Sequence, residues 1–299
     1  MEFITIPCHE SLRPFIRNYW MINARCTATG TQQIFSNGAA SLHFYLSQDI
    51  RIDDGDRQYR TVLFHQNMHK AGVVTTEGAF VIFGAEFVPF CSRVFFPDAP
   101  SLLGRAGGEA YASPEDLHDE EFTTLSKDIH AADNTEKRVG LLDDFFLKRL
   151  ARFPDDDINM KRLSDVFDNI VPTDGSTAHP SHSQNEFSPA DLASTACLSQ
   201  KQFTRVFNKY VGMNPKSYLR LLRFHKALME IQATSDSSSL TNIAWSCGYY
   251  DFAHMASDFR DICGYSPSEL IRHGQELTET FGQQFSGLMK KKIKIENLI

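Results

Sequence analysis

The 299-residue chain lacks the long apolar segments that membrane or exported proteins carry. No run reaches the roughly 18 consecutive apolar residues that a transmembrane helix needs, so we expect no membrane partner. The N-terminal stretch Met1 to Pro7 has no basic segment followed by an apolar one, so no secretory signal peptide is expected. The six cysteines form no CxxC pair, which argues against a disulfide scaffold and is typical of a cytoplasmic protein.

The common catalytic and metal motifs are also missing. The sequence contains no GxSxG, no phosphate-binding P-loop and no HExxH, so we expect neither catalytic residues nor a cofactor. His65 and His69 have the look of a metal pair, but no carboxylate or further histidine follows at the spacing of metal-binding cupins. We therefore expect no metal and no enzyme, although an enzyme with a catalytic β domain fused to a DNA-binding module remains the alternative.

The charge is distributed unevenly along the chain. The formal net charge is −7, yet the part from Glu186 onward has 13 Lys and Arg against 11 Asp and Glu. Within it, residues 192–229 contain no acidic residue and seven basic ones: Lys201, Arg205, Lys209, Lys216, Arg220, Arg223 and Lys226. Such a local basic field is an electrostatic footprint for phosphates, or else a solvated basic face.

Composition divides the chain into four segments. Residues 172–188 have few large apolar side chains and many Ser, Pro and His, which is typical of a linker. Before it, residues 1–171 begin with β-like runs such as Leu42 to Leu46 and end in amphipathic helical patterns. We predict a β-sandwich or barrel with helices there, serving sensing or dimerisation. An all-α domain then covers residues 189–273, and a C-terminal extension covers 274–299.

Two stretches within the all-α domain share the same sequence pattern. Each begins with an aliphatic residue and an alanine, at Leu192-Ala193 and at Ile243-Ala244. A tight turn follows about four residues later, and then a helix that ends in phenylalanine before a glycine and a proline. The small alanine allows two helices to pack closely, and Gly248 tolerates the positive φ of a sharp turn. The pattern predicts two helix-turn-helix units, each with a second helix free to enter a major groove.

The first turn departs from this pattern, because Cys197 stands where the second turn has Gly248. Either the first turn avoids positive φ, or it stores some strain.

A long helix is predicted between the two units, from Pro215 to Ile231. Its apolar residues recur at helical spacing, and Lys216, Arg220 and Arg223 form a second stripe at i, i+4 and i+7. One face would then lie against protein and the other would face anions. Two helix-turn-helix units joined by such a helix predict sequence-specific binding to double-stranded DNA.

The span Ala190 to Leu270 closely resembles the DNA-binding domain of the AraC/XylS family of bacterial transcriptional regulators. The second unit carries the diagnostic residues Ile243-Ala244, Cys247-Gly248-Tyr249, Phe259 and Gly264-Tyr265-Ser266-Pro267. In the N-terminal part, Phe35 to Gly38, Leu42 to Leu46 and Gly84 to Pro89 look like a cupin-like β domain found before such domains. The resemblance implies an α+β protein with an N-terminal cupin-like domain, a pair of recognition helices in successive major-groove segments, and activation as the commoner mode.

Matching positions imply which residues would read bases. These are Lys201, Thr204 and Arg205 in the first unit and Phe252, Ala253, His254 and Ser257 in the second. Arg205 is the favoured base contact, because arginine reads guanine with two hydrogen bonds, with a phosphate contact as its alternative. The expected phosphate contacts are Gln200, Gln202, Lys209, Lys216, Arg220, Arg223 and Arg260.

The second unit is acidic for a DNA-binding element. Residues 236–273 contain Asp236, Asp251, Asp258, Asp261 and Glu269 against Arg260 and Arg272. We therefore expect the first unit to supply most of the electrostatic affinity and the second unit mainly shape and positioning.

Further partners follow from this interpretation as expectations. They are a small-molecule effector or a protein at the N-terminal domain, RNA polymerase, and a second copy of the chain. His43 and Glu86 lie in β segments where a sensor pocket could form, but we favour core or surface roles for both. No ligand-binding residue can be named from the sequence.

Overall fold

A computed structural model describes residues 2–24, 30–34, 38–47, 50–52, 57–64, 72–76, 79–97, 99, 111–153, 157–170, 187–233 and 240–272. The chain divides into two compact units. Unit 1 comprises Met1–Asp157 and Thr204–Tyr218, and unit 2 comprises Ile158–Phe203 and Leu219–Ile299. Most of the expected linker at 172–188 lies outside the described residues, so the four expected segments stay a prediction. No helix in the described ranges is long and apolar enough to cross a membrane.

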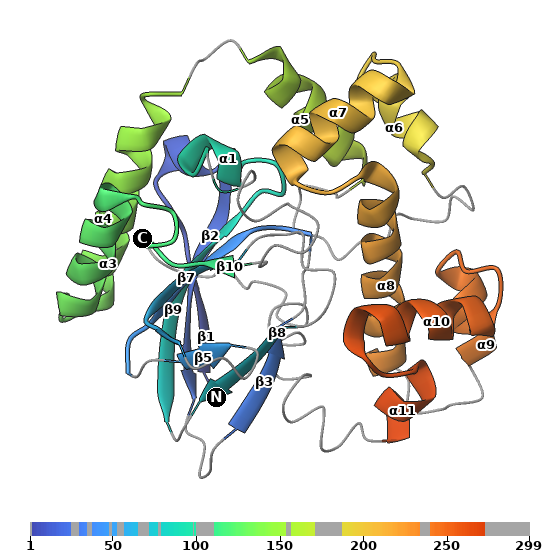
Figure 1. Ribbon diagram of the computed structural model, residues 1–299, viewed down its shortest axis with the longest axis horizontal. Helices are drawn as coiled ribbons and strands as arrows, with labels where there is room; N and C mark the ends of the chain where they lie inside the picture. The colour runs from blue at the N-terminus through green and yellow to red at the C-terminus, as the bar shows by residue number, and fades with distance from the viewer. Residues whose placement is uncertain are drawn as a thin grey trace, which may run out of the picture. The chain divides into compact units, whose positions relative to one another are not determined.

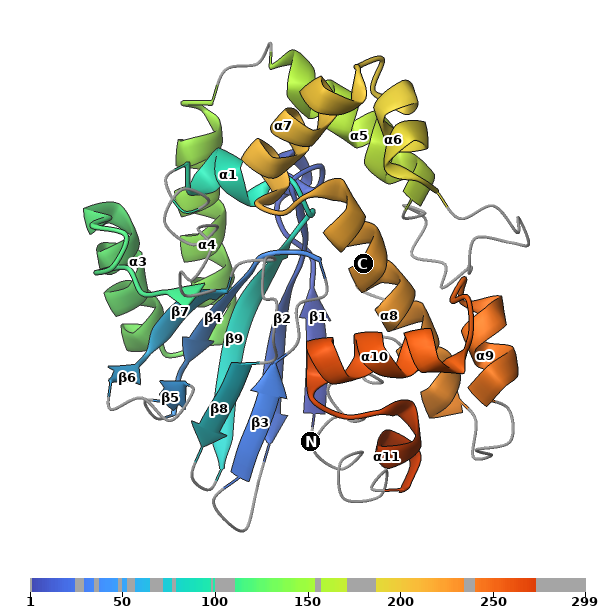
Figure 2. The same cartoon turned by 45° about the vertical axis from the view of Figure 1, so that its right-hand side comes forward.

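Unit 1 contains two antiparallel sheets. A six-stranded sheet has the order β1-β2-β9-β4-β7-β10, and a four-stranded sheet has the order β3-β8-β5-β6. Figure 2 shows strands β1 to β9 of the two sheets. The strands are β1 (Glu2–Ile6), β2 (Ile16–Ala24), β3 (Gly30–Ile34), β4 (Ser41–Tyr45), β5 (Ile50–Ile52), β6 (Gln58–Tyr59), β7 (Thr61–Phe64), β8 (Gly72–Thr76), β9 (Phe80–Phe87) and β10 (Tyr111–Ala112).

Successive side chains of the central strands point to opposite faces of the six-stranded sheet, as the two-residue period of a strand requires. One set packs in a core shared with β5 and β6 of the four-stranded sheet: Trp20, Ile22, Tyr45, Ile50, Ile52, Tyr59, Val62, Phe64, Phe80, Ile82 and Tyr111. The alternate residues of the same strands, such as Tyr19, Phe44 and Phe83, are also buried. Both faces of this sheet are therefore covered.

Gly84 allows the central strands to pack closely against Trp20. A Cβ atom at this position would lie 2.4 Å from the Leu42 carbonyl oxygen and 2.4 Å from the indole ring of Trp20. The backbone oxygen cannot move away without disturbing the pairing of β4 with β9, which aligns His43 with Gly84. The close approach gives a physical reason for glycine at this point of β9.

Helices cover the other face of the six-stranded sheet (Figure 1). They are η1 (Glu10–Leu12), α1 (Ser92–Phe95), α3 (Glu120–Ala131) and α4 (Thr135–Leu150). The contact is aromatic: Tyr19 of β2 stacks on Phe146 of α4 with ring centroids 6.4 Å apart, and Phe95 of α1 lies 4.7 Å from Phe146.

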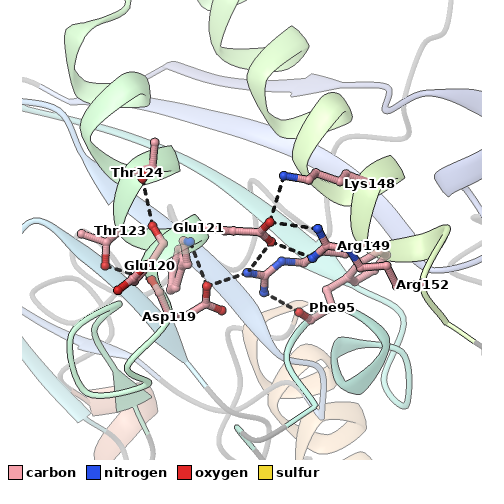
Figure 3. Close-up of polar contacts among 10 residues, drawn as sticks. Phe95, Asp119, Glu120, Glu121, Thr123, Thr124, Lys148, Arg149 and Arg152 are labelled. Carbon is pink, nitrogen blue, oxygen red and sulfur yellow. Dashed lines mark hydrogen bonds and ion pairs between the residues drawn. The ribbon is translucent and has the colours of Figure 1, made fainter.

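An ion-pair cluster joins α3, α4 and α1 (Figure 3). Arg149 of α4 is 10% exposed, and its two terminal nitrogens donate to Asp119 and to the Phe95 carbonyl oxygen, each at 2.6 Å. Hydrogen bonds from Arg152 and Lys148 hold the pKa of the nearby Glu121 carboxyl at about 2. Asp119 also accepts a hydrogen bond from the Phe122 amide as the N-cap of α3, so the cluster stabilises both the helix start and the helix packing.

The described part of the C-terminal region is helical. Its helices are α5 (Ile158–Ile170), α6 (Pro189–Thr195), α7 (Gln200–Val211), α8 (Pro215–Ala233), α9 (Leu240–Ser246), α10 (Phe252–Cys263) and α11 (Pro267–Arg272). The expected combination of an N-terminal β domain with helices and a C-terminal helical domain is confirmed. The cupin-like detail stays a prediction.

Candidate nucleic-acid interface

The two helix-turn-helix segments make their turns with matching hydrogen bonds. In the first, the Leu198 amide donates to the Ala193 carbonyl oxygen at 2.9 Å. In the second, the Tyr249 amide donates to the Ala244 carbonyl oxygen at 2.8 Å. Both alanines are buried, so each allows a close helix contact at the same place.

The residue before each of these donors has positive φ. Gly248 has φ +82°, and Cys197, at the equivalent place, has φ +52°. Of the two alternatives for the first turn, the structure shows the strained one, because a non-glycine residue adopts the left-handed conformation. Gly264, which ends α10, also has positive φ.

Side chains at the start of α7 and α10 cap their exposed amide groups. The hydroxyl oxygen of Ser199 accepts a hydrogen bond from the backbone N–H of Gln202. In return, the side-chain oxygen Oε1 of Gln202 accepts hydrogen bonds from the backbone N–H of Ser199 at 3.2 Å and from its hydroxyl at 2.8 Å. Asp251 accepts from the His254 amide at 2.7 Å. Gln202, expected at the edge of the DNA contact, therefore has a structural role at the start of α7.

α7 presents a polar face opposite its buried aromatic residues. Phe203 and Phe207 are buried, whereas Lys201 and Arg205 are exposed and Thr204 is half-buried. Gln200 is exposed at the first position of the helix. The residues expected to read bases from the first unit thus share an accessible helix that carries positive charge.

α10 presents a mostly uncharged face. Ala253, His254 and Ser257 are exposed, and Phe252 is half-buried. Sequence reasoning missed two exposed aromatic residues of this unit, Trp245 at 63% and Tyr250 at 87% exposure. Their exposure comes from the fold, since an apolar ring in a helical pattern more often predicts a core position.

The ring of His254 is held in one orientation. Its Nδ1 atom accepts a hydrogen bond from the Tyr250 amide at 3.4 Å, and the ring lies edge-on to Tyr249 with centroids 5.3 Å apart. Since Nδ1 accepts, the neutral ring carries its proton on Nε2. His254 can therefore present one hydrogen-bond donor.

Two cations of the long helix α8 contact other parts of unit 2. Arg220 donates from Nε to Asp258 and from Nη2 to Asp261, each at 2.7 Å, and thereby joins α8 to α10, which lies beside it (Figure 1). The guanidinium of Arg223 lies over the ring of Tyr249, 5.3 Å from its centroid. The basic face of α8, which we expected to face anions, is thus partly occupied by contacts with other protein groups.

The remaining cations differ in their surroundings. Lys226 donates to the Ser246 carbonyl oxygen at 2.7 Å. Lys209, Lys216 and Arg260 are exposed. Whether any of these residues contacts DNA stays a prediction.

The acidic residues of the second unit have structural roles. Asp251 caps α10, Asp258 and Asp261 pair with Arg220, and Glu269 accepts from the Ser266 amide at 2.7 Å at the start of α11. Asp236 lies outside the described residues. Most of the carboxylates that make the second unit acidic therefore cap a helix or form an ion pair.

His43 and Glu86 occupy structural positions in unit 1. His43 is half-buried, its ring lies edge-on to Trp20 with centroids 4.7 Å apart, and desolvation lowers its pKa to about 3. Glu86 is buried and pairs with Arg17 at 2.9 Å. His65 and His69 lie outside the described residues, within which no group of metal-ligating side chains occurs.

Two family descriptions match the chain. Residues 192–273 match "Helix-turn-helix domain", and residues 4–105 match "Domain of unknown function (DUF6597)". The first match contains almost all of both helix-turn-helix segments.

Curated relatives match over the same C-terminal region. The transcriptional activator RhaS of Escherichia fergusonii is 36% identical over 85 residues, 28% of this chain and 30% of the relative. The transcriptional regulator ArgR of Pseudomonas aeruginosa is 32% identical over 79 residues, 26% of this chain and 23% of the relative. The chain thus matches less than a third of the length of these relatives.

Among solved structures, ToxT from Vibrio cholerae is similar over 85% of this chain and 97% of its own, with 12% identity and a TM-score of 0.43.

Proposed function

We propose that this chain, whose residues 192–273 are a helix-turn-helix domain of the AraC/XylS family, is a sequence-specific DNA-binding regulator of transcription with an unequal pair of recognition helices. α7 would supply most of the electrostatic affinity, and α10 mainly shape and positioning. The observation that carries this proposal is the contrast between the exposed Lys201 and Arg205 on α7 and the exposed Ala253, His254 and Ser257 on α10.

The two helices would recognise different features of a major groove. Arg205 can donate two parallel hydrogen bonds to the acceptors of guanine, whereas His254 can donate one, from Nε2, to a base acceptor. Alanine and serine on α10 offer a methyl contact and a single hydrogen bond. α10 therefore neutralises few phosphates, and the affinity that depends on charge falls to α7 and the start of α8.

The N-terminal unit, with its two antiparallel sheets, is proposed as a cupin-like sensing domain whose ligand or protein partner changes DNA binding. RNA polymerase, a second copy of the chain, and a location in the cytoplasm stay predictions. Activation is favoured because RhaS is named an activator. The relatives named above are called regulators, so we do not propose an enzyme; substrate turnover by the purified chain would contradict this choice.

The unequal division is tested by DNA-binding titration on sites selected from a random pool. Arg205→Glu should weaken binding on the order of tenfold or more, because it removes a charge-assisted contact and adds repulsion. Arg260→Glu, an equal change of charge at an exposed residue of α10, should weaken binding by less than about threefold. Equal losses would contradict the proposed division, and no enriched sequence would contradict sequence-specific binding.

A further inference from the structure

We propose that Arg223 of α8 is a positioning residue for base recognition: it restrains the ring of Tyr249, which in turn fixes the imidazole of His254 on α10. Arg223 would then act on the base that the second unit prefers, and not through a phosphate. This inference rests on the proposed function, since it names the residues that give α10 a base preference.

The ring of Tyr249 is a fixed support within unit 2. Tyr249 is 3% exposed, and its backbone amide donates to the Ala244 carbonyl oxygen at 2.8 Å in the turn before α10. The guanidinium of Arg223 lies over this ring, 5.3 Å from its centroid. A cation is attracted to the negative face of an aromatic ring, and more strongly where water is excluded. The half-buried Arg223 therefore restrains the plane of the Tyr249 ring.

The imidazole of His254 is held at two places. Its ring lies edge-on to Tyr249, with centroids 5.3 Å apart and an angle of 85° between the ring planes. Its Nδ1 atom accepts a hydrogen bond from the Tyr250 amide at 3.4 Å. The hydrogen bond alone would leave the imidazole free to tilt, and the contact with Tyr249 restricts that tilt. Together the two contacts set the direction of the Nε2–H bond.

His254 differs in this respect from the other exposed residues of the α10 face. Ala253 offers a methyl group, and the hydroxyl of Ser257 can rotate to donate or to accept. A fixed N–H donor is more selective, because guanine, adenine and thymine present acceptors in the major groove, whereas cytosine presents an amino donor. We expect His254 to disfavour cytosine at the position that it contacts, and we expect this preference to depend on Arg223.

A phosphate contact by Arg223 and a positioning role give opposite results. A phosphate contact changes affinity on all sequences alike and contributes about −0.9 to the slope of log K against log salt concentration. A positioning residue changes the base preference at one place in the site and leaves the salt slope unchanged. Lys216, an exposed cation at the start of the same helix, is the matched control.

The test selects sites from random DNA with the full-length chain and its variants, and then measures affinities by fluorescence anisotropy over a range of salt concentrations. His254→Ala should remove the preference at one position and weaken binding to the parent's best site about threefold to tenfold. Arg223→Met should relax the preference at that same position and leave the salt slope unchanged. Lys216→Met should keep the preference and make the slope shallower by about 0.9.

Variants of Tyr249 separate positioning from a general loss of structure. The Tyr249 hydroxyl is buried and has no hydrogen-bond partner among the described residues, so Tyr249→Phe keeps the supporting ring and should bind as the parent does. Tyr249→Leu should relax the same position as Arg223→Met. The double variant Arg223→Met with His254→Ala should bind no more weakly than His254→Ala alone, because both changes remove one interaction.

A shallower salt slope for Arg223→Met with an unchanged base preference would overturn the inference and assign Arg223 to a phosphate. Additive losses in the double variant would overturn it as well, and both results leave the proposed regulator standing.

Failure of the regulator gives a different result, namely that the parent chain enriches no sequence. NMR of the imidazole nitrogens in the DNA-free chain then still decides whether Arg223 positions His254. The parent should carry the His254 proton on Nε2, and Arg223→Met should shift these resonances while Lys216→Met should not. Equal spectra for the parent and Arg223→Met would overturn the positioning role.

Discussion

Cys197 and Gly248 occupy equivalent places in two turns of the same geometry, yet they differ in how well they tolerate it. Both have positive φ, at +52° and +82°. For an L-residue with a Cβ atom the left-handed conformation costs on the order of 1–2 kcal/mol, whereas glycine adopts it freely. The first turn therefore keeps its shape against a local preference, held by the hydrogen bond from Leu198 to Ala193 and by buried side chains on either side.

Replacing Cys197 with glycine and Gly248 with alanine should change the free energy of unfolding in opposite directions. Cys197→Gly should raise the free energy of unfolding by up to about 1 kcal/mol, since relief of strain exceeds the extra freedom of glycine in the unfolded chain. Gly248→Ala should lower it by about 1–2 kcal/mol. Urea denaturation followed by circular dichroism at 222 nm measures both, and a change of the same sign in both variants would contradict the argument.

The half-buried His43 should make unit 1 sensitive to acid. Its pKa is lowered from 6.5 to about 3 by burial, so below pH 6.5 the unfolded chain takes up a proton that the folded chain refuses. The stabilisation is present above pH 6.5 and is lost as the pH falls toward 3, by roughly 1.4 kcal/mol per pH unit.

Urea titrations between pH 7 and pH 4, followed by tryptophan fluorescence, measure this loss. A Trp245→Phe background removes the exposed tryptophan and leaves Trp20, whose ring lies against His43. His43→Gln, which cannot titrate, should lose less stability than the parent over this range. Parallel pH profiles in the two proteins would show that His43 does not carry the effect.

At the scale of elements, α8 and α10 are joined by a charge pair with unequal exposure. The side chain of Asp258 is 8% exposed, that of Arg220 38%, and that of Asp261 63%. A buried carboxylate that loses its partner destabilises a protein far more than an exposed one does. Arg220 therefore stabilises the placement of the second recognition helix chiefly through Asp258.

This difference can be measured by substitution. Arg220→Met should destabilise the protein by about 2 kcal/mol or more, because it leaves Asp258 buried and unpaired. Asp261→Asn should cost less than about 1 kcal/mol. Combining Arg220→Met with Asp258→Leu should recover part of the loss, and a double variant as unstable as the sum of its single changes would contradict the pairing.

At the scale of the whole molecule, net charge is a poor guide to DNA binding. The chain carries −7, but the acidic residues described in the second unit are used in caps and ion pairs. Of the seven cations between residues 192 and 229, Lys201, Arg205, Lys209 and Lys216 are exposed, although Lys209 also lies over the ring of Tyr210. The other three are half-buried and contact protein groups.

The dependence of DNA affinity on salt concentration should show how many of these cations contact phosphates. Each phosphate contact contributes about −0.9 to the slope of log K against log salt concentration. The four exposed cations of this stretch predict a slope of about −3.6, or about −4.5 with the exposed Arg260 of α10, whereas all seven cations of the stretch predict about −6. We expect a slope between about −3 and −5, measured by fluorescence anisotropy from roughly 50 to 200 mM salt. A slope of −6 or steeper would show that Arg220, Arg223 and Lys226 also reach the DNA.

The sequence by itself determined the features that depend on neighbouring residues. The alanine in the helix before each turn and the positive φ at Gly248 were predicted from residues within a few positions of the turn. The β-like run from Leu42 to Leu46 likewise predicted a strand, which is β4 in the structure, and the two helix-turn-helix units were predicted from short-range patterns as well.

Only the tertiary structure decided which charges remain available. Arg220 meets its partners 38 and 41 residues further along the chain, and no local period relates such positions. The exposure of Trp245 and Tyr250 also depends on which elements pack together. A helical pattern shows which residues share a face, but what lies opposite that face depends on the long-range packing of the chain.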